Sequence, residues 1–243
     1  MAWKLFSGKT KNQAEAWNIR TMFGPNLNFA ATEAYKLLRT NLMFSFPGED
    51  TCHVIGITSS VQGEGKSSTA CNTAYALAEA GESVLLLEAD LRRPTIASKL
   101  GLARAPGLSN LLVSRSDYHE VLQQCPLSPG MHIITSGDIP PNPSELLGSN
   151  RMAQLIERLR GEYDYIIIDM PPVTAVSDAI VASKLVDGIA VVVRSRVADQ
   201  QMLAEALRQL RMVDVRILGF VYRDTDTGGK QYSRGYKKYS YKY

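Results

Sequence analysis

One segment of the chain has the residue types and spacing of a phosphate-binding loop: TSSVQGEGKSS, residues 58–68. Gly63 and Gly65 permit a tight backbone whose N–H groups, with those of a following helix, can wrap a polyphosphate. Lys66 would reach the β and γ phosphates, and the Ser67 hydroxyl would join a magnesium shell. Ser60 stands at the first glycine of the standard Walker A spacing, so a glycine-rich turn with an exposed lysine is the alternative.

Acidic residues end two apolar runs further along the chain. Asp90 follows LLLEA, and Asp169 follows YIII. Open α/β sheets bind ligands at the carboxyl ends of their strands, so both acids would lie beside the same phosphates. Asp169 could instead be an ordinary strand-ending residue before two prolines. Glu88 has two interpretations, a catalytic base or an acid satisfied by Arg92 or Arg93.

These side chains require a sheet whose strands end at a common edge. Apolar runs predict strands at residues 53–58, 83–88, 132–135, 165–169, 188–194 and 215–222. Helical patterns lie at residues 30–44, with Thr32 as a possible N-cap, and at 66–80, 150–160, 175–186 and 198–212. Near-continuous apolar strands are typical of sheets covered on both faces. We therefore predict a doubly wound, mostly parallel α/β sheet of the P-loop NTPase type, with helices on both faces.

The composition indicates a globular chain of one main domain. Of its 243 residues 45% are hydrophobic and 21% charged, and the longest purely apolar runs are only four or five residues. No run approaches the roughly 18 to 20 residues of a membrane span, and the N-terminus lacks a secretory signal pattern. The three cysteines are widely spaced and odd in number, which favours buried free thiols in the cytoplasm.

Charge and tyrosine are concentrated in the last 16 residues. The whole chain has a net charge of +3, yet residues 228–243 carry five basic residues and no acid, so the remainder is near −2. This balance argues against a nucleic-acid-binding body. The same segment holds five of the 11 tyrosines: Tyr232, Tyr236, Tyr239, Tyr241 and Tyr243. Glycine and polar residues before them predict a flexible tail. Stacking on single-stranded nucleic acid, or contact with an anionic membrane, is the alternative role.

The chain resembles the bacterial tyrosine kinases (BY-kinases) that control capsular and exopolysaccharide synthesis. The resemblance covers residues 29–243 and rests on five matches: EAYKLLRTN at 33–41, the Walker A loop, LEADLR at 87–92 as Walker A′, IDMP at 168–171 as Walker B, and the terminal tyrosine cluster. The run IPPNPSELL at 139–147 is also similar to the family. We found no catalytic role for that run from sequence.

The resemblance implies a domain division and a set of roles. Residues 1–28 would be an irregular arm, 29–222 a P-loop kinase domain with an oligomerisation helix at 29–45, and 223–243 a flexible basic tyrosine-rich tail. ATP and Mg²⁺ would be the cofactors. The implied catalytic residues are Lys66, Glu88 and Asp90. The implied nucleotide-binding residues are Gly63, Glu64, Gly65, Lys66, Ser67 and Ser68; the metal ligands are Ser67, Asp90 and Asp169; and the oligomerisation residues are Glu33, Lys36 and Arg39.

By the same resemblance, the tyrosine cluster would be autophosphorylated in trans within a ring-shaped homo-oligomer, an octamer, that regulates polysaccharide synthesis and export. The implied partners are a transmembrane activator of the polysaccharide co-polymerase type and a tyrosine phosphatase, with no nucleic acid. The chain would be cytoplasmic and peripheral at the inner face of the membrane through that activator.

Four residues depart from the family pattern: Glu88 for aspartate, Gln62 for proline, Lys36 for arginine, and Arg223 for an asparagine that recognises adenine. A Min- or Par-type switch ATPase is the alternative function, although Val61 stands where those proteins carry a second lysine. A nucleotide-independent binding module using its tail is the third.

Overall fold

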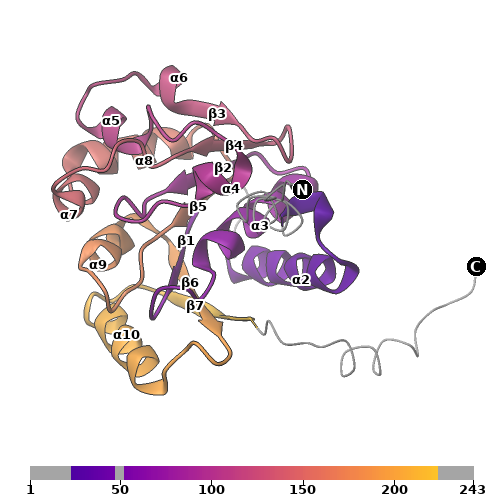
Figure 1. Cartoon of the computed structure of the whole chain (residues 1–243). Helices are drawn as coiled ribbons and strands as arrows, with labels where there is room; N and C mark the ends of the chain where they lie inside the picture. Colours follow the sequence, from indigo (N-terminus) through magenta and orange to yellow (C-terminus); the bar gives the residue numbers. More distant parts are fainter. Residues whose placement is uncertain (1–22, 47–51, 224–243) are drawn as a thin grey trace, which may run out of the picture.

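The protein is a seven-stranded α/β sheet in a computed structural model that describes residues 23–46 and 52–223 (Figure 1). Its strands are β1 (His53–Ser59), β2 (Val84–Glu88), β3 (Leu122–Gln124), β4 (Met131–Ile134), β5 (Tyr165–Asp169), β6 (Gly188–Arg194) and β7 (Ile217–Arg223). The strand order is β3-β4-β2-β5-β1-β6-β7. All neighbours pair in parallel except β3 with β4, so the predicted mostly parallel P-loop sheet is confirmed.

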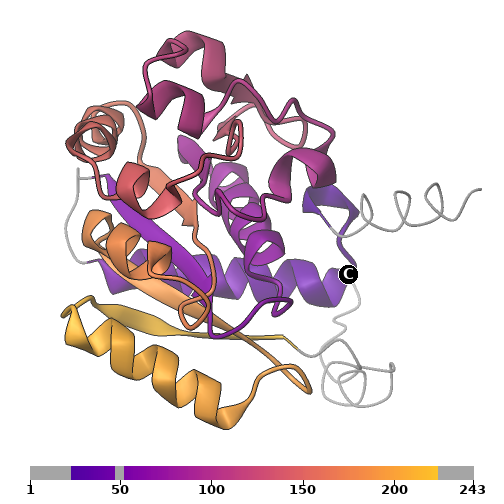
Figure 2. The same cartoon turned by 60° about the vertical axis from the view of Figure 1, so that its left-hand side comes forward.

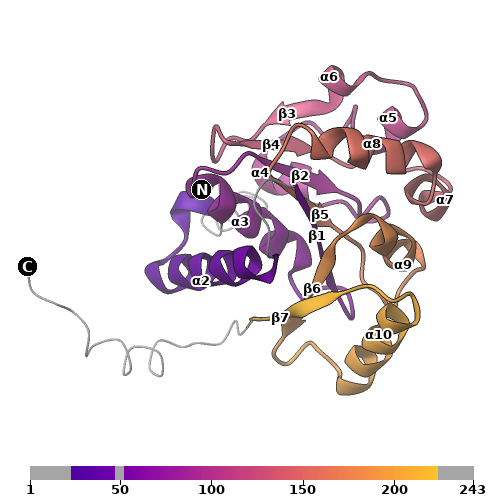
Figure 3. The ribbon, with the colours of Figure 1, turned by 180° about the vertical axis from the view of Figure 1, so that it is seen from behind.

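Helices cover both faces of this sheet. They are η1 (Gly24–Asn26), α2 (Phe29–Ser45), α3 (Lys66–Glu79), α4 (Ile96–Leu100), α5 (Leu108–Leu112), α6 (Tyr118–Val121), α7 (Pro143–Leu147), α8 (Asn150–Arg160), α9 (Asp178–Ala182), η2 (Ser183–Leu185) and α10 (Gln200–Met212). Figures 1 and 3 show α2 and α3 on one side of the sheet and α8, α9 and α10 on the other. Figure 2 shows α10 beside β7 at one edge.

Alternate residues of the central strands feed two separate apolar cores. Leu85 and Leu87 of β2 face the core beneath α8, α9 and α10, whereas Val84 and Leu86 face the core beneath α2 and α3. All five residues of β2 and of β5 are buried. Because each strand is covered on both faces, its sequence is continuously apolar instead of alternating.

Two local expectations were wrong and one strand was missed, each for a physical reason. The N-cap of α2 is Asn28, whose side chain accepts a hydrogen bond from the Ala31 N–H at 2.9 Å, while Thr32 lies inside the first turn. The helix expected at 175–186 begins only at Asp178, because Thr174 is hydrogen-bonded through its N–H and hydroxyl to the Ser60 carbonyl. The antiparallel β3 was missed, since three half-exposed residues have no readable period.

The end of the predicted N-terminal arm packs against α3. Phe23 is buried in the core beneath α2 and α3, and the Gly24 N–H donates to the Asn72 side chain at 2.9 Å. Residues 1–22 and the tail from 224 onward lie outside the described residues, and so do all five tail tyrosines. Arg223, assigned to the tail from sequence, is instead the last residue of β7. No helix of the described part is both long and apolar enough to cross a membrane.

Candidate nucleotide-binding and phosphotransfer site

The P-loop, residues 60–65, connects β1 to α3 at the carboxyl edge of the sheet. Gly63 and Gly65 have φ angles of +87° and +92°, in the left-handed region where side chains are strained. Gly65 is also the N-cap of α3, so the first N–H groups of that helix point toward the loop. A Cβ atom at Gly65 would lie 1.8 Å from Nη1 of Arg223, so a side chain at this position would require Arg223 to move.

Glu64 holds the P-loop together from inside. Its Oε2 atom accepts hydrogen bonds from the Ser60 hydroxyl and the Val61 N–H, both at 2.8 Å, and its side chain is fully buried. Its Oε1 atom accepts the Arg194 N–H at 3.4 Å. The hydroxyl of Ser60, which replaces the first Walker A glycine, therefore has a structural use. Glu64 is left with its backbone N–H to offer a phosphate.

Lys66 lies between the two acids that the sequence placed at the strand ends. Its Nζ atom is 2.7 Å from Asp90 Oδ2, 3.5 Å from Asp169 Oδ1, and 3.4 Å from the Ser67 hydroxyl. Burial alone would lower the pKa of Lys66, but the charges of Asp169 and Asp90 outweigh it and raise that pKa. The ammonium is thus a fixed charge held among carboxylates at the mouth of the P-loop.

Asp169 has the features of a cation ligand. It is fully buried, its carboxylate oxygens accept no hydrogen bond of ordinary geometry within the described residues, and its ion-pair partner Lys66 is 3.5 Å away. Burial raises its pKa, although the Lys66 charge acts in the opposite direction. A buried carboxylate is costly unless a cation compensates it, and Lys66 at 3.5 Å compensates it from a longer distance than it does Asp90. Together with Asp90 and the Ser67 hydroxyl, it offers the oxygen ligands that Mg²⁺ accepts.

This donor set fits magnesium because that ion usually takes one or two protein carboxylates and completes its shell with water and substrate phosphates. In the described ranges 23–46 and 52–223, no group of three or more His, Cys, Asp and Glu side chains forms a metal cage. The residues present therefore fit a magnesium ion that arrives with a nucleotide, not one held by protein alone.

The Glu88 carboxylate accepts hydrogen bonds from three backbone N–H groups. Its Oε1 atom accepts the N–H groups of Thr95 and Ile96 at 2.6 Å each, and its Oε2 atom accepts the Ser136 N–H at 3.1 Å. The side chain is fully buried. Burial raises its pKa, against the lowering effect of those N–H bonds. Glu88 thereby ties the end of β2 to the start of α4 and to the segment after β4.

The Walker A′ turn is fixed by its own side chains. Asp90 accepts the Arg93 N–H at 3.0 Å through Oδ1, while the Arg93 guanidinium donates to Gln62 in the P-loop. Arg92 instead forms an ion pair with Asp178, at 2.7 Å. Neither arginine bonds to Glu88 in the part of the chain described, so the sequence-based pairing of Glu88 with Arg92 or Arg93 is wrong.

Two basic residues at the P-loop, Arg194 and Lys99, were not identified from sequence, and Arg223 was noted there only as a replacement for an adenine-recognising asparagine. Arg194 donates to the Gly63 carbonyl at 3.0 Å, and Arg223 donates to the Gly65 carbonyl at 3.1 Å. Both arginines end an apolar strand, which is the signal that could have found them. Lys99 of α4 donates to the Ser68 hydroxyl at 3.5 Å, and burial lowers the pKa of this lysine.

The polar residues predicted for oligomerisation make contacts within one chain. Lys36 is paired with Glu33 at 3.1 Å, and Arg39 donates to the Ala76 carbonyl of α3 at 2.9 Å. Apolar side chains of α2 are exposed nearby, with Leu37 at 62% and Phe44 at 84%. Within the described structure, α2 therefore combines an internally satisfied polar motif with an exposed apolar surface.

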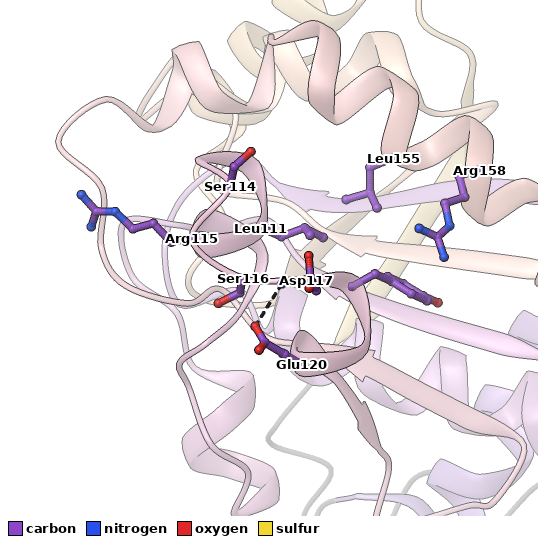
Figure 4. A pocket seen from close by; sticks show the side chains of 9 residues that line it. Leu111, Ser114, Arg115, Ser116, Asp117, Glu120, Leu155 and Arg158 are labelled. Carbon is purple, nitrogen blue, oxygen red and sulfur yellow. Dashed lines mark hydrogen bonds between the residues drawn. The ribbon is translucent and has the colours of Figure 1, made fainter.

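A pocket of about 510 Å³ lies away from the P-loop, between α8 and the α5–α6 segment (Figure 4). Leu111 and Leu155 line it together with Arg158, whose guanidinium lies 4.5 Å from the centre of the Tyr118 ring. It contains none of the residues predicted for the site. The nucleotide site is thus defined by the exposed rim of the P-loop and not by this pocket.

The fold and the loop define a class of protein. A family model described as "ParA: NUBPL iron-transfer P-loop NTPase" matches residues 50–224, from before β1 to the end of β7. The match spans most of the chain and agrees with the parallel sheet and the glycine-rich loop after β1. The chain is therefore a P-loop NTPase, as the sequence predicted.

Relatives define the family within that class. Tyrosine-protein kinase YwqD of Bacillus subtilis (strain 168) is 35% identical over 210 residues, 86% of this chain and 85% of that protein. The kinase domain of Escherichia coli tyrosine kinase ETK has a TM-score of 0.76 at 31% identity, covering 88% of this chain and 80% of that one. The chimerical protein CapA2B2 has a TM-score of 0.73 at 35% identity, covering 78% and 82%. This chain belongs to the bacterial tyrosine kinases and is a protein-tyrosine kinase, which confirms the resemblance.

Proposed function

We propose that this kinase uses ATP and Mg²⁺ to phosphorylate its own C-terminal tyrosine cluster in trans, within a homo-oligomer, and thereby regulates capsular or exopolysaccharide synthesis and export. The observation that carries the proposal is the contact of Lys66 with Asp90 and Asp169 at the P-loop, in a chain of this family. The switch ATPase alternative is not favoured, because the relatives are named tyrosine kinases and Val61 replaces its second lysine.

The residues of the site divide the work of phosphoryl transfer. The N–H groups at the start of α3 and of Gly63 and Gly65 receive the phosphates, and Lys66 turns from its carboxylates to the same anion. Asp169 and Ser67 would hold the metal, with the Asp90 carboxylate beside it. When bound, magnesium neutralises phosphate charge. These groups position the nucleotide and stabilise charge, the main requirements of this chemistry.

A tyrosine hydroxyl needs a proton acceptor, because its ordinary pKa of about 10 keeps it neutral at pH 7. Of the acids at the site, Glu88 has both oxygens on backbone N–H groups, and Asp169 is fully buried. Asp90 is 4% exposed, and its Oδ2 atom becomes free when Lys66 moves to the phosphates. We therefore assign proton acceptance to Asp90, with Glu88 in the supporting role of fixing the turn.

The tail changes sign when it is phosphorylated. Residues 228–243 carry about +5, and each phosphotyrosine adds about −1.5 to −2 at pH 7. Three phosphorylations bring the tail to roughly +0.5 to −1, so attraction to an acidic, nucleotide-loaded neighbouring site is lost. We propose that this loosens the ring. Equal oligomer distributions of phosphorylated and unphosphorylated protein in light scattering, with Mg-ATP across salt concentrations, would contradict the idea.

The oligomer is proposed to form through α2, with the exposed Leu37 and Phe44 in the contact and Glu33, Lys36 and Arg39 shaping the helix surface. Leu37→Ser and Phe44→Ser change exposed side chains, so they leave the fold intact. Light scattering should show a smaller assembly for these variants at equal Mg-ATP. An unchanged assembly size would remove α2 from the interface.

We also propose a transmembrane activator as partner, which would hold the kinase at the inner membrane face, and a tyrosine phosphatase that reverses the modification. The support is the CapA2B2 structure, a chimerical protein that resembles this chain at 35% identity. Adding the cytoplasmic segment of the candidate activator should raise the autophosphorylation rate. No change in either phosphorylation or ATP hydrolysis would argue against that partner.

The deciding experiment is the intact mass of the purified chain after incubation with Mg-ATP. It is compared with Lys66→Met and with a truncation ending at Gly228, each with and without the activator segment. Additions of phosphate mass that require both Lys66 and the tail are the expected result. ATP hydrolysis without phosphate addition under every condition would refute the autokinase.

A further inference from the structure

The segment 139–147, which resembles the family but had no role from sequence, reaches the catalytic turn through one buried acid. Within it, Pro143 begins α7 and Ser144 follows, and the Ser144 hydroxyl donates to Oδ1 of Asp178. Asp178 is the first residue of α9 and is fully buried. Figures 1 and 3 show α7 and α9 together on the side of the sheet away from α2.

The same Asp178 carboxylate binds the Walker A′ turn. Arg92 donates to it twice, from Nε to Oδ2 at 2.7 Å and from Nη2 to Oδ1 at 3.1 Å. Burial would raise the pKa of Asp178, but the bonds from Arg92 and Ser144 outweigh it and lower that pKa. A charged, two-bond contact of this kind fixes direction as well as distance. Asp178 therefore holds Arg92 in one orientation.

Arg92 is two residues from Asp90, the acid that contacts Lys66 at 2.7 Å. The intervening Leu91 is fully buried, and the Asp90 carboxylate accepts the Arg93 N–H at 3.0 Å. A turn of four residues with three anchored side chains cannot shift one without moving the others. The position of Asp90 relative to a metal thus depends on the anchor at Asp178.

We propose that Asp178 is a positioning residue for the metal and the transferred phosphate: it fixes Arg92 so that Asp90 keeps its place, and residues 139–147 act on the site through Ser144. The inference rests on the proposed Mg-nucleotide function of the same site. It gives residues 139–147 a role, which is to support Asp90 of the Walker A′ turn through Asp178 and Arg92.

Asp178→Asn tests this, because it removes the charge and keeps the volume. Asp187→Asn is the matched control: Asp187 also accepts two bonds from an arginine, Arg160, at 2.8 and 3.0 Å. It lies just before β6 and also accepts the Val54 N–H at the start of β1, at the opposite edge of the sheet from the P-loop. Each variant loses an arginine–aspartate ion pair, but only the pair at Asp178 is connected to Asp90.

The measurement is the Mg²⁺ concentration that gives half-maximal binding of a fluorescent ADP analogue, with kcat and KM for ATP alongside. Residues that orient metal ligands typically change metal affinity or activity by about 10- to 100-fold. Asp178→Asn should raise the Mg²⁺ requirement about tenfold or more and lower kcat, with the KM for ATP nearly unchanged. Asp187→Asn should lower the melting temperature only.

Equal Mg²⁺ requirements in Asp178→Asn, Asp187→Asn and the parent would overturn the proposal. If the parent binds Mg-ADP but phosphorylates no tyrosine, the kinase function fails while the binding comparison still decides the role of Asp178. Should Asp178→Asn not fold, Ser144→Ala and Arg92→Gln replace it, since the Arg92 side chain is 44% exposed. The same rise in Mg²⁺ requirement is expected from both, and its absence would overturn the proposal equally.

Discussion

For Glu88, a catalytic role and a structural role predict opposite effects of substitution on the reaction rate and the melting temperature. It stands where the family usually has an aspartate proposed as base, yet three backbone N–H groups, of Thr95, Ile96 and Ser136, occupy its carboxylate. Glu88→Gln keeps the length of the side chain. It replaces one acceptor oxygen with an amide group that faces a backbone N–H, so at least one buried donor is left without a partner.

The expected cost follows from that count. One unsatisfied buried polar group destabilises a protein by about 1–3 kcal/mol. For a chain of this size, each kcal/mol shifts the melting temperature by about 2–4 °C, so Glu88→Gln should melt about 2–12 °C lower. The autophosphorylation rate at a temperature where the variant is fully folded should stay within about tenfold of the parent. By contrast, loss of a general base lowers a rate by about 10²–10⁴-fold.

The assay combines thermal unfolding with intact mass after timed incubation with Mg-ATP. Glu88→Asp is the companion variant, because it shortens the side chain by one methylene and restores the family residue. We expect it also to melt lower, since the shorter carboxylate cannot reach both α4 and the Ser136 N–H. A rate loss of 100-fold or more in Glu88→Gln, with an unchanged melting temperature, would refute the structural role and make Glu88 the base.

Three further results are expected. Gly65→Ala should weaken binding of a fluorescent ADP analogue, because the added Cβ displaces Arg223 and the left-handed backbone is strained; adding Arg223→Ala should restore only part of the affinity, and full restoration would contradict the strain. Lys66→Met should destabilise the fold more at pH 8 than at pH 5 in urea. Burial raises the pKa of Asp169 and the Lys66 charge counteracts this, so losing Lys66 makes the ionised Asp169 costlier to bury as pH rises; equal losses would contradict this. Asp187→Asn should have a lower free energy of unfolding than the parent at pH 7, and the two values should converge in acid. The lowered pKa of Asp187 stabilises the parent above about pH 3.8, and this stabilisation is lost as the pH falls through the pKa of the folded state.

Sequence patterns predicted the parts of this fold that depend on long apolar runs. The strand at 165–169 and the helix at 150–160 have the predicted bounds, because burial on both faces or on one stripe leaves a clear pattern. The helix expected at 175–186 was too long, because its start is bound to the P-loop by Thr174, a contact between segments 114 residues apart. Local hydrophobic patterns do not reveal contacts between segments so far apart in the sequence.

The candidate site, too, could be predicted from the sequence only in part. Lys66, Asp90 and Asp169 could be placed together because strand ends share an edge, and the structure has them in contact. The partners of Glu88 could not be predicted, since they are backbone N–H groups that every residue except proline carries. The link from Arg92 to Asp178 was also out of reach, because nothing in the spacing of these residues states that α9 returns to the Walker A′ turn.

The contact between Arg223 and the Gly65 carbonyl has a consequence for substrate supply. It places the last described residue of β7 at the P-loop, so the segment that carries the tyrosines continues from a residue beside the site. Tyr232 is nine residues beyond Arg223 and Tyr243 is twenty, which allows spans of at most about 30 Å and about 70 Å at 3.3–3.6 Å per residue. A tethered substrate acts at an effective concentration set by its linker, in the millimolar range for short flexible linkers. Within an assembly, the phosphorylation rate would then be independent of protein concentration, and orientation instead of reach would select between a chain's own site and its neighbour's.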